Sequence, residues 1–430
     1  MSGLPPGFTP TPQGGCGRTM AGVPRRLLAF LLTGACGLLP PGPAVAAEPP
    51  LTASAAAERA VRASGAVRAL ERAVEAARAR ARAAGAWPNP AVVSQYQLST
   101  DPGNHMLTVG VRQPLDFRGL ARQRQEAAED GALAIAAELT ATRRQVAYQA
   151  RRAYVSLWLA LATVRGHEAD QRYLRDELAR GKRRVAAGAL AAHELIHTEF
   201  ELALAHQRWV QAGHDAERAR DRLNVLFGSP VATPIPMPPV ALAAPAPEGD
   251  LATWVAEARR QRAEPLQAEL GARQERRSAR LAESLRFGEG ELDLEGGTAG
   301  PYGAPMLYSA FSLPVPLWND HAAEAAAHEA EAARQEAQRA AAEATIAAEV
   351  TDAWLETRQA AARVEEVARG PLALAGHALE KARARLAAGA GSPVEVLEAR
   401  QQQREAETSH LQALLAYHLA RLRLEEAAGR

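Results

Sequence analysis

The sequence carries one pattern twice, about 200 residues apart, and this duplication limits the folds that the chain can adopt. The segment RVAAGA at 184–189 returns as RLAAGA at 385–390, so the offset is 201 positions (385 − 184). Pro114 and Pro314, each at the end of a predicted strand, are separated by nearly the same offset, 200 positions (314 − 114). A duplicated structural unit explains these correspondences together. We therefore divide the chain into a first repeat at 47–228, a proline-rich linker at 229–250 and a second repeat at 251–430.

Each repeat is predicted to contain the same four parts. A helix at 52–85 or 251–284 leads into two short strands, and a long helix then starts near residue 118 or 320 and reaches the Ala-Ala-Gly turn. A return helix completes the repeat. The helices are predicted from apolar residues at three- and four-residue spacing, as in Val146, Ala150, Ala153, Leu157, Leu161 and Val164. Gly188 and Gly389 suit the turns, where a positive φ is often needed.

Helix length predicts how these parts pack. A long helix of about 70 residues measures about 100 Å, and the two shorter helices of one repeat together reach about the same length. Stacked end to end, they can lie antiparallel to the long helix. Aromatic residues make up only 5% of the chain, so we expect small side chains at the helix contacts and a coiled-coil sheet of helices rather than a globule.

The strands are predicted to be amphipathic. In the first, Val92, Tyr96 and Leu98 lie opposite Val93, Gln95 and Gln97. In the second, apolar residues alternate with Thr108, Gly110 and Arg112. In the third, Leu292 and Leu294 alternate with four acidic residues, Glu289, Glu291, Asp293 and Glu295. The fourth offers Leu307, Phe311 and Leu313. This alternation predicts one apolar and one polar face, with the acidic residues on the polar face.

The number of strands predicts an oligomer. A tilted strand of about 9 residues can cross the hydrocarbon of a membrane, but four strands cannot close a pore or pair their own edges in lipid. Three copies would give a twelve-stranded barrel. The expected fold is therefore mainly α with a small β part: duplicated long antiparallel helical hairpins, plus four strands per protomer in a trimeric membrane β-barrel. Two surface hairpins on a soluble helical bundle are the alternative.

The N-terminus has the pattern of a secretory signal, expected at residues 1–46. Two arginines precede an apolar stretch at 27–39, which ends near the small-residue sequence Ala44-Val45-Ala46. Met20 is a more ordinary starting residue than Met1. The only two cysteines, Cys16 and Cys36, lie in this segment, and Thr33-Gly34-Ala35 before Cys36 is a poor lipidation sequence. The mature chain then lacks cysteine, and no later stretch of about 18 apolar residues could form a membrane-spanning helix.

Charge and motifs argue against other functions. Fifty basic residues balance 49 acidic ones, so no basic field attracts nucleic acid.

The segment His193-Glu194-Leu195-Ile196-His197 matches the H-E-x-x-H zinc-protease signature. A continuous helix would hold the third candidate ligand, Glu217, about 30 Å from His197, too far to share one ion. The second repeat has Glu395 but no histidines there. A weak metal contact by His193 and His197 stays open, but no enzyme activity and no cofactor are predicted.

Several segments, in this order, resemble the TolC family of outer-membrane efflux proteins over essentially the whole mature chain. They are Trp87-Pro88-Asn89-Pro90, Gln113-Pro114-Leu115-Asp116-Phe117-Arg118-Gly119, Leu223-Asn224-Val225-Leu226-Phe227-Gly228, Pro314-Val315-Pro316-Leu317-Trp318-Asn319 and the region from Ala388 to Ala399. The exits from the strands look most like the heavy-metal branch, which works with cobalt-zinc-cadmium pumps.

The resemblance implies a homotrimer with its barrel in outer-membrane lipid and a helical tunnel in the periplasm. An inner-membrane resistance-nodulation-division pump and a periplasmic adaptor would be its partners. It implies aperture residues Glu395 and Glu398, with Glu194 as the counterpart in the first repeat, and adaptor-contact tips at Gly188, Ala189, Gly389 and Ala390. Gly391 stands where the family often has a basic residue that holds the entrance closed. The main rival is an exported periplasmic helical scaffold or adaptor.

Overall fold

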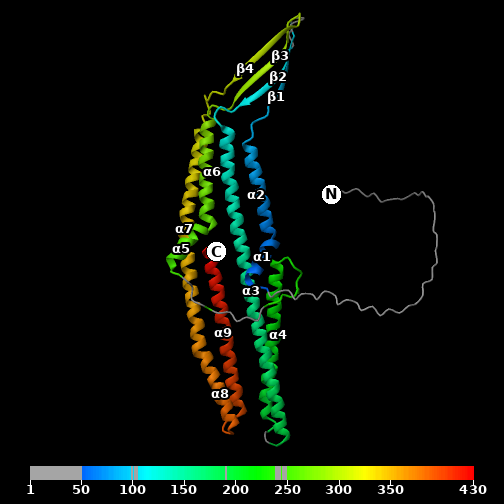
Figure 1. The fold of residues 1–430 in the computed structure, drawn as a ribbon, viewed down its shortest axis with the longest axis vertical. Coiled ribbons are helices and arrows are strands. Elements are labelled where there is room, and N and C mark those ends of the chain that lie inside the picture. The colour runs from blue at the N-terminus through cyan, green and yellow to red at the C-terminus, as the bar shows by residue number, and fades with distance from the viewer. Residues whose placement is uncertain (1–50, 98–99, 101–104, 189–190, 238–243, 245–248) are drawn as a thin grey trace, which may run out of the picture. The chain divides into compact units, whose positions relative to one another are not determined.

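The computed structural model describes residues 51–97, 100, 105–188, 191–237, 244 and 249–430. The chain divides into a unit at 1–48 and a unit at 49–430. The predicted signal, Cys16, Cys36, Leu98 and Ala189 lie outside the described residues. Within the second unit, the fold is mainly helical with one four-stranded antiparallel sheet, which confirms the predicted fold class (Figure 1).

The first half of the second unit contains four helices and two strands. They are α1 (Ala53–Ala63), α2 (Gly65–Ala84), β1 (Ala91–Gln97), β2 (Met106–Leu115), α3 (Leu120–Ala186) and α4 (Glu194–Leu226). The single helix predicted at 52–85 is therefore wrong in one respect, because it breaks at Ser64. This residue has extended backbone (φ −64°, ψ 122°), and its hydroxyl accepts a hydrogen bond from the N–H of Val67 as the cap of α2.

The second half has the same order of elements with one addition. It contains α5 (Leu251–Gln261), α6 (Ala263–Leu285), β3 (Gly290–Ala299), β4 (Ala304–Ser312), α7 (Ala322–Val367), a π-helical turn η1 (Ala368–Leu372), α8 (Ala373–Ala387) and α9 (Pro393–Ala427). The helix predicted at 251–284 breaks at Arg262. The long helix expected from residue 320 is interrupted by η1, because Pro371 has no N–H to donate and its ring crowds the preceding turn.

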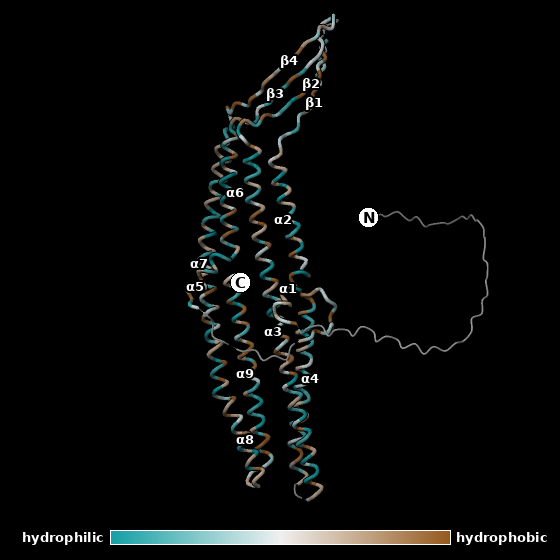
Figure 2. Tube along the Cα trace, viewed as in Figure 1, coloured by the Kyte–Doolittle hydropathy of each residue, from teal (hydrophilic) through white to brown (hydrophobic). Residues whose placement is uncertain are grey.

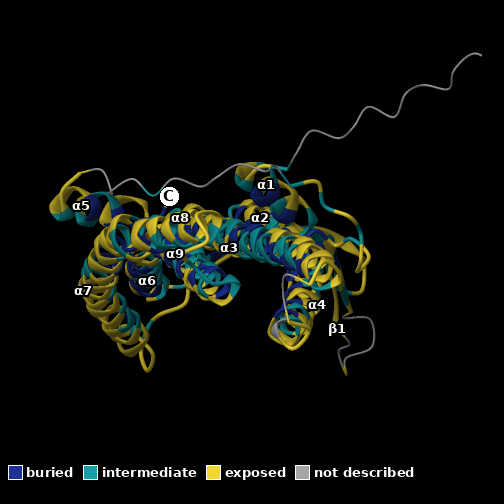
Figure 3. Ribbon diagram, turned by 90° about the horizontal axis from the view of Figure 1, so that it is seen from below, coloured by how far each residue is buried: buried dark blue, intermediate teal, exposed yellow. Residues whose placement is uncertain are grey.

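Helix α3 lies at the centre of the helical array. It packs against α1, α2 and α4 of the first half and against α6 and α9 of the second, while α7 packs against α5, α6 and α9. Hydrophobic and hydrophilic residues alternate along the helices (Figure 2). Viewed along the helices, the buried residues lie between neighbouring helices and the exposed ones cover the remaining surface (Figure 3). Among the described residues, no helix is long and apolar enough to span a bilayer.

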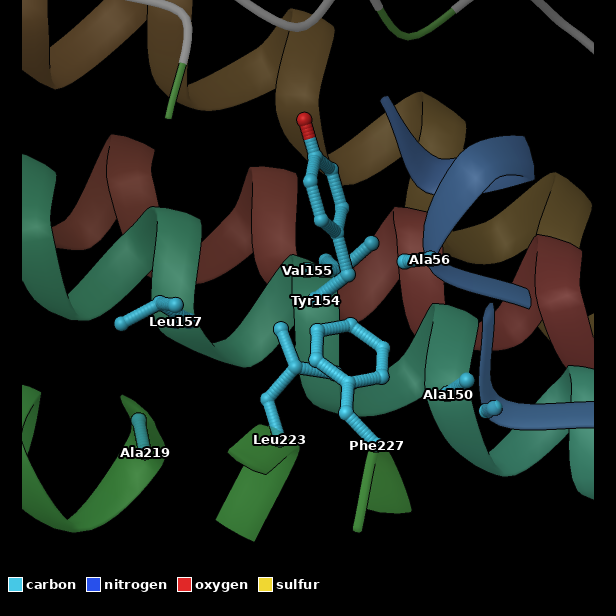
Figure 4. Packing of buried hydrophobic residues seen from close by; sticks show 9 residues of the cluster. Ala56, Ala150, Tyr154, Val155, Leu157, Ala219, Leu223 and Phe227 are labelled. Atoms are coloured by element: carbon cyan, nitrogen blue, oxygen red, sulfur yellow. The ribbon is translucent and has the colours of Figure 1, made fainter. Parts of the chain in front are cut away.

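The core is built largely from alanine, as predicted. In one cluster Tyr154 and Leu157 of α3 meet Leu223 and Phe227 at the end of α4, and Ala56 of α1 closes the contact (Figure 4). The Tyr154 hydroxyl donates to the carbonyl of Leu51 at 2.9 Å. A second cluster joins α5, α7 and α9 through Trp254, Val350, Ala353 and Leu424. The shorter helices therefore pack beside the long one in both halves.

His418 of α9 makes the stability of the helical part depend on pH. Burial, with a smaller contribution from Arg421, lowers its pKa from 6.5 to about 4. The unfolded chain takes up this proton near pH 6.5 but the folded chain only near pH 4, so the stability is fully present above pH 6.5 and decreases as pH falls towards 4. His418→Leu should make this decrease clearly smaller, as measured by thermal unfolding from pH 4 to 7. The exposed His377, changed to Leu, should leave it intact; the same slope in His418→Leu as in the wild type would contradict the prediction.

Candidate functional site

The four strands form one antiparallel sheet in the order β1-β2-β3-β4. The register places Val92 opposite Val111, Val111 opposite Leu294, and Leu292 opposite Phe311. Apolar side chains from all four strands therefore share one face, as the alternation predicts. Eight of the large ones are exposed, while Leu292 is half-buried: the exposed ones are Val92, Tyr96, Leu107, Val109, Val111, Leu294, Leu307 and Phe311. We call these eight residues the apolar face.

The opposite face of the sheet carries the predicted acidic residues, but arginines neutralise much of their charge. Asp293 receives two hydrogen bonds from Arg112, at 2.7 and 3.0 Å, and Arg124 of α3 pairs with Glu289, which lies just before β3. Glu291 lies 3.9 Å from Arg112. These arginine partners could not be predicted from the sequence, because strand pairing and the position of α3, which carries Arg124, depend on the tertiary fold.

Glu295 is the most enclosed of these carboxylates, with only 1% of its surface exposed. The Thr108 hydroxyl of the adjacent strand β2 and the Gln95 amide of β1, one strand further on, donate hydrogen bonds to it. Glu295 stands directly opposite Gly110, which leaves room for its side chain. The polar face is therefore internally hydrogen-bonded, while the apolar face has no covering layer among the described residues.

Gly110 is predicted to be essential for this arrangement. A Cβ at this position would lie 2.1 Å from the carbonyl oxygen of Leu294 and 2.6 Å from Cγ of Glu295. Gly110→Ala should destabilise the β2–β3 pairing by about 1–3 kcal/mol, as overpacking usually does. The yield of correctly assembled protein in detergent extracts should fall while circular dichroism still shows the helices. Gly296→Ala is the matched control, because nothing lies within 4 Å of its added Cβ; equal losses in both variants would contradict the prediction.

The two Ala-Ala-Gly segments form tight helix ends, as predicted. Gly188 has φ 71° and Gly389 has φ 72°. At the second turn, the N–H of Gly389 donates to the carbonyl of Leu386 and that of Ala390 to the carbonyl of Arg385, the hydrogen bonds of a Schellman motif. Both glycines therefore occupy positions that favour residues without a Cβ.

Glu395 lies in the first turn of α9, beside the second tip. Ser392 caps α9 by accepting a hydrogen bond from the Glu395 N–H, and the Glu395 carboxylate lies 3.6 Å from Arg385 of α8. Arg385 also donates to the carbonyl of Ala390 at 3.2 Å. The basic partner of the predicted aperture residue Glu395 is therefore Arg385, which precedes the turn. Gly391, which follows the turn, has no side chain that could take this role. Glu194 is the first residue of α4, and its side chain lies outside the described part.

Glu398 lines a half-open groove of about 450 Å³ between α3, α4 and α9. At its floor Asp170 of α3, with 9% of its side chain exposed, lies 3.5 Å from Arg400 and 3.3 Å from Arg404 of α9. The two arginine side chains are also largely buried, at 17% and 11% exposed. We call Asp170, Arg400 and Arg404 the inter-hairpin cluster, because it joins the helices of the two halves.

The inter-hairpin cluster was not predicted, although the sequence contains one signal for it. The apolar three- and four-residue pattern of α3 continues through His167, Asp170 and Gln171 to Leu174, so polar residues occupy contact positions. His167 lines the same groove, and burial, followed by the charge of Arg404, lowers its pKa below the ordinary value. A charged contact between α3 and α9 follows from this pattern only once the pairing of the helices is known.

The H-E-x-x-H segment starts at the entrance to α4. His193 precedes the helix, His197 lies in its first turns, and both are exposed. Helix α4 continues without a break to Leu226, which confirms the predicted continuous helix and keeps His197 about 30 Å from Glu217. In the described part of the chain, no group of three or more His, Cys, Asp or Glu residues is arranged to hold a metal ion.

Comparison with solved structures shows the same fold in outer-membrane channels. The channel OprN superposes with a TM-score of 0.69 and 18% identity, covering 88% of this chain and 89% of that one. VceC from Vibrio cholerae gives 0.68 and 17%, covering 88% and 96%. The open-state channel MtrE from Neisseria gonorrhoeae gives 0.68 and 19%, covering 88% of each. Comparison with curated protein sequences finds no match.

The family comparison covers both halves of the chain. The model for outer membrane efflux proteins matches residues 56–229 and again residues 254–430. These two matches include the apolar face, both glycine turns and the inter-hairpin cluster. With most of its residues matched, the chain belongs to the outer membrane efflux protein family.

Proposed function

We propose that this protein is the outer-membrane channel of a tripartite efflux system, acting as a passive exit duct for solutes. The observation that carries the proposal is the apolar face of the sheet: Leu307, for example, is 82% exposed and Val92 is 80% exposed. Soluble monomers rarely expose contiguous apolar patches larger than a few hundred Å². The hydrocarbon interior of a membrane is the environment that suits such a face best.

The edges of the sheet support a trimer. Each of β1 and β4 has a neighbour on one side only, and an unpaired strand edge cannot be left in hydrocarbon, where water is absent. Pairing β1 of one copy with β4 of the next satisfies both edges. Three copies then give a closed barrel of twelve strands, with the apolar face outwards and Glu291, Asp293 and Glu295 inwards.

The helices would continue the duct into the periplasm. We propose Gly188, Ala189, Gly389 and Ala390 as the contacts at which a periplasmic adaptor would dock and deliver cargo from a resistance-nodulation-division pump. Glu194, Glu395 and Glu398 would surround the entrance, and three copies would concentrate carboxylates there and favour cations. Opening of this duct would depend on helix movement and partner binding.

Two further parts of the proposal concern processing and organisation. We propose residues 1–46 as a secretory signal that is removed after export. The division into repeats at 47–228 and 251–430 is supported by the two separate family matches, which fall almost entirely within them.

We propose heavy-metal cations as the cargo, supported by the resemblance of Pro314-Val315-Pro316-Leu317-Trp318-Asn319 to the heavy-metal branch. Deletion of the gene should then sensitise cells to zinc, cobalt or cadmium more than to organic drugs. The reverse order of sensitivity would assign the channel to drug export and leave its channel function intact.

The channel function itself is tested by extraction of the outer membrane in detergent. We expect a heat-modifiable trimer that conducts ions in planar bilayers. A monomer recovered in the soluble periplasmic fraction, with no conductance, would instead support the rival function of an exported helical scaffold.

A further inference from the structure

Two unpaired arginines share one aromatic ring where the sheet joins the helices. The guanidinium of Arg118, between β2 and α3, lies 4.4 Å from the ring centre of Phe287, and that of Arg286, at the end of α6, lies 5.7 Å from it. Both arginine side chains belong to exposed residues. In the described part of the chain, neither has a carboxylate within ion-pair distance, whereas the nearby Arg122 and Arg124 pair with Glu126 and Glu289.

Local structure explains only part of this arrangement. Arg286 caps the C-terminus of α6, where a positive charge is favourable. Arg118 comes just before the N-terminus of α3, where a positive charge is unfavourable, and Asp116 already accepts hydrogen bonds from the N–H groups of Leu120 and Ala121. Arg118 donates one hydrogen bond, to the carbonyl of Ser284 at 3.1 Å. Two guanidiniums around one ring repel each other, and an anion between them would relieve that repulsion.

An apolar surface begins immediately beside these arginines. Phe117, next to Arg118 in the chain, is 69% exposed, and its ring meets that of Phe311 edge to face at a centroid distance of 6.0 Å. Gly290 allows this contact, because a Cβ there would lie 2.9 Å from the Phe117 ring. Phe311 belongs to the apolar face, and the exposed Leu313 follows it. A pair of positive charges therefore adjoins one end of the face assigned to lipid.

We propose that Arg118 and Arg286 bind the phosphate of an anionic phospholipid, whose acyl chains lie along Phe117, Phe311 and Leu313. The proposal rests on the proposed function, since it needs the apolar face to lie in a membrane. Guanidinium groups hold phosphate oxygens through paired hydrogen bonds. Basic residues at a membrane surface also favour anionic lipids. The chemistry selects a phospholipid of the leaflet nearest the helices, with a negatively charged headgroup such as phosphatidylglycerol.

The experiment uses the purified full-length mature trimer in detergent, titrated with phosphatidylglycerol or with phosphatidylcholine. Native mass spectrometry counts the bound lipids, and the temperature of trimer dissociation is followed in parallel. The wild type should prefer phosphatidylglycerol, and the Arg118→Gln/Arg286→Gln variant should lose most of this preference, by about 25-fold, on the basis of about fivefold for each of the two arginines. Its conductance should remain unchanged.

The matched control is Arg183→Gln/Arg363→Gln. This pair removes the same charge from two exposed arginines that also lack an ion-pair partner among the described residues. It should retain the lipid preference. Equal loss in both double variants, or no loss in either, would overturn the proposal.

Two further outcomes are separable. If inorganic phosphate at millimolar concentration displaces phosphatidylglycerol completely, the arginines bind free phosphate and the lipid assignment is wrong. If Arg118→Gln/Arg286→Gln fails to form trimers, Arg118→Lys/Arg286→Lys keeps both charges without the paired hydrogen bonds and should retain part of the lipid preference; complete loss of the preference for phosphatidylglycerol in that variant would count against the proposal. A wild-type protein that forms no trimer at all would instead refute the channel function.

Discussion

Val109→Arg is expected to abolish assembly of the protein in the outer membrane. Val109 lies in the middle of β2 on the apolar face, opposite Ser94 and Gly296, and is 53% exposed. An arginine on the lipid face near the bilayer centre costs about 2–4 kcal/mol, and each trimer would contain three. The amount of heat-modifiable trimer in outer-membrane extracts should therefore fall at least tenfold. Because Val109 is not part of a packed core, the helices should still fold.

The control for this variant is a positive charge on the other face at nearly the same depth. Tyr308 is opposite Glu295, one rung of the ladder from Val109, and its side chain points to the polar face. Tyr308→Arg should assemble normally, because the new charge faces a carboxylate. Normal trimer yield in Val109→Arg would mean that the apolar face does not lie in lipid. Equal failure of both variants would show that the sheet tolerates no arginine, whichever face it occupies.

Asp170→Asn is expected to have the second largest effect, because Asp170 is the carboxylate of the inter-hairpin cluster. Removing its charge leaves Arg400 and Arg404, which are largely buried, facing each other across the α3–α9 contact. Breaking a buried pair on one side usually costs about 3–5 kcal/mol. Glu407, 3.0 Å from Arg404, compensates part of the charge, so we expect a loss of about 3 kcal/mol in the free energy of unfolding.

The same substitution should change conduction. The cluster holds α9 against α3 close to Glu395 and Glu398, so its loss should loosen the entrance and increase the resting conductance of the reconstituted channel. Asp176→Asn removes an exposed carboxylate from the same helix and should change neither stability nor conductance. In a double-mutant cycle, adding Arg404→Gln should cost less in the Asp170→Asn background than in the wild type. Additive losses would show that the two side chains do not act together.

Much of the fold could be predicted from local pattern. Alternation along the strands indicated which residues of β1 to β4 share a face, because the side-chain period of a strand is fixed at two. The glycine turns were also predictable, since Gly188 and Gly389 end helices in the same sequence context. The interruptions of the helices were not predicted, because at each of them a single residue overrides a long alanine-rich helical pattern. Ser64 caps a new helix, and Pro371 changes the hydrogen bonding of one turn while the helix continues.

The contacts between distant segments could not be predicted in the same way. Asp170 and Arg404 are more than 200 positions apart, and nothing in either segment indicates that α3 and α9 are neighbours. The pairing of Arg124 with Glu289 also depends on how α3 meets the sheet. The Arg385–Glu395 pair is closer in sequence and follows from the tight turn between α8 and α9. The sequence pattern therefore predicts which residues share a face of a strand or helix. Which charged residues form ion pairs depends on the tertiary fold.

The position of the apolar face in lipid can be measured directly with single cysteines. The chain has only Cys16 and Cys36, both within the proposed signal, so an added cysteine in the mature protein can be labelled alone. Leu307→Cys places a fluorophore on the apolar face, and Met306→Cys places one on the polar face of the same strand. In reconstituted vesicles we predict strong quenching of the Leu307→Cys label by nitroxide lipids and weak quenching of the Met306→Cys label. Equal access of water-soluble quenchers to both positions, with no lipid quenching at Leu307→Cys, would contradict a membrane channel.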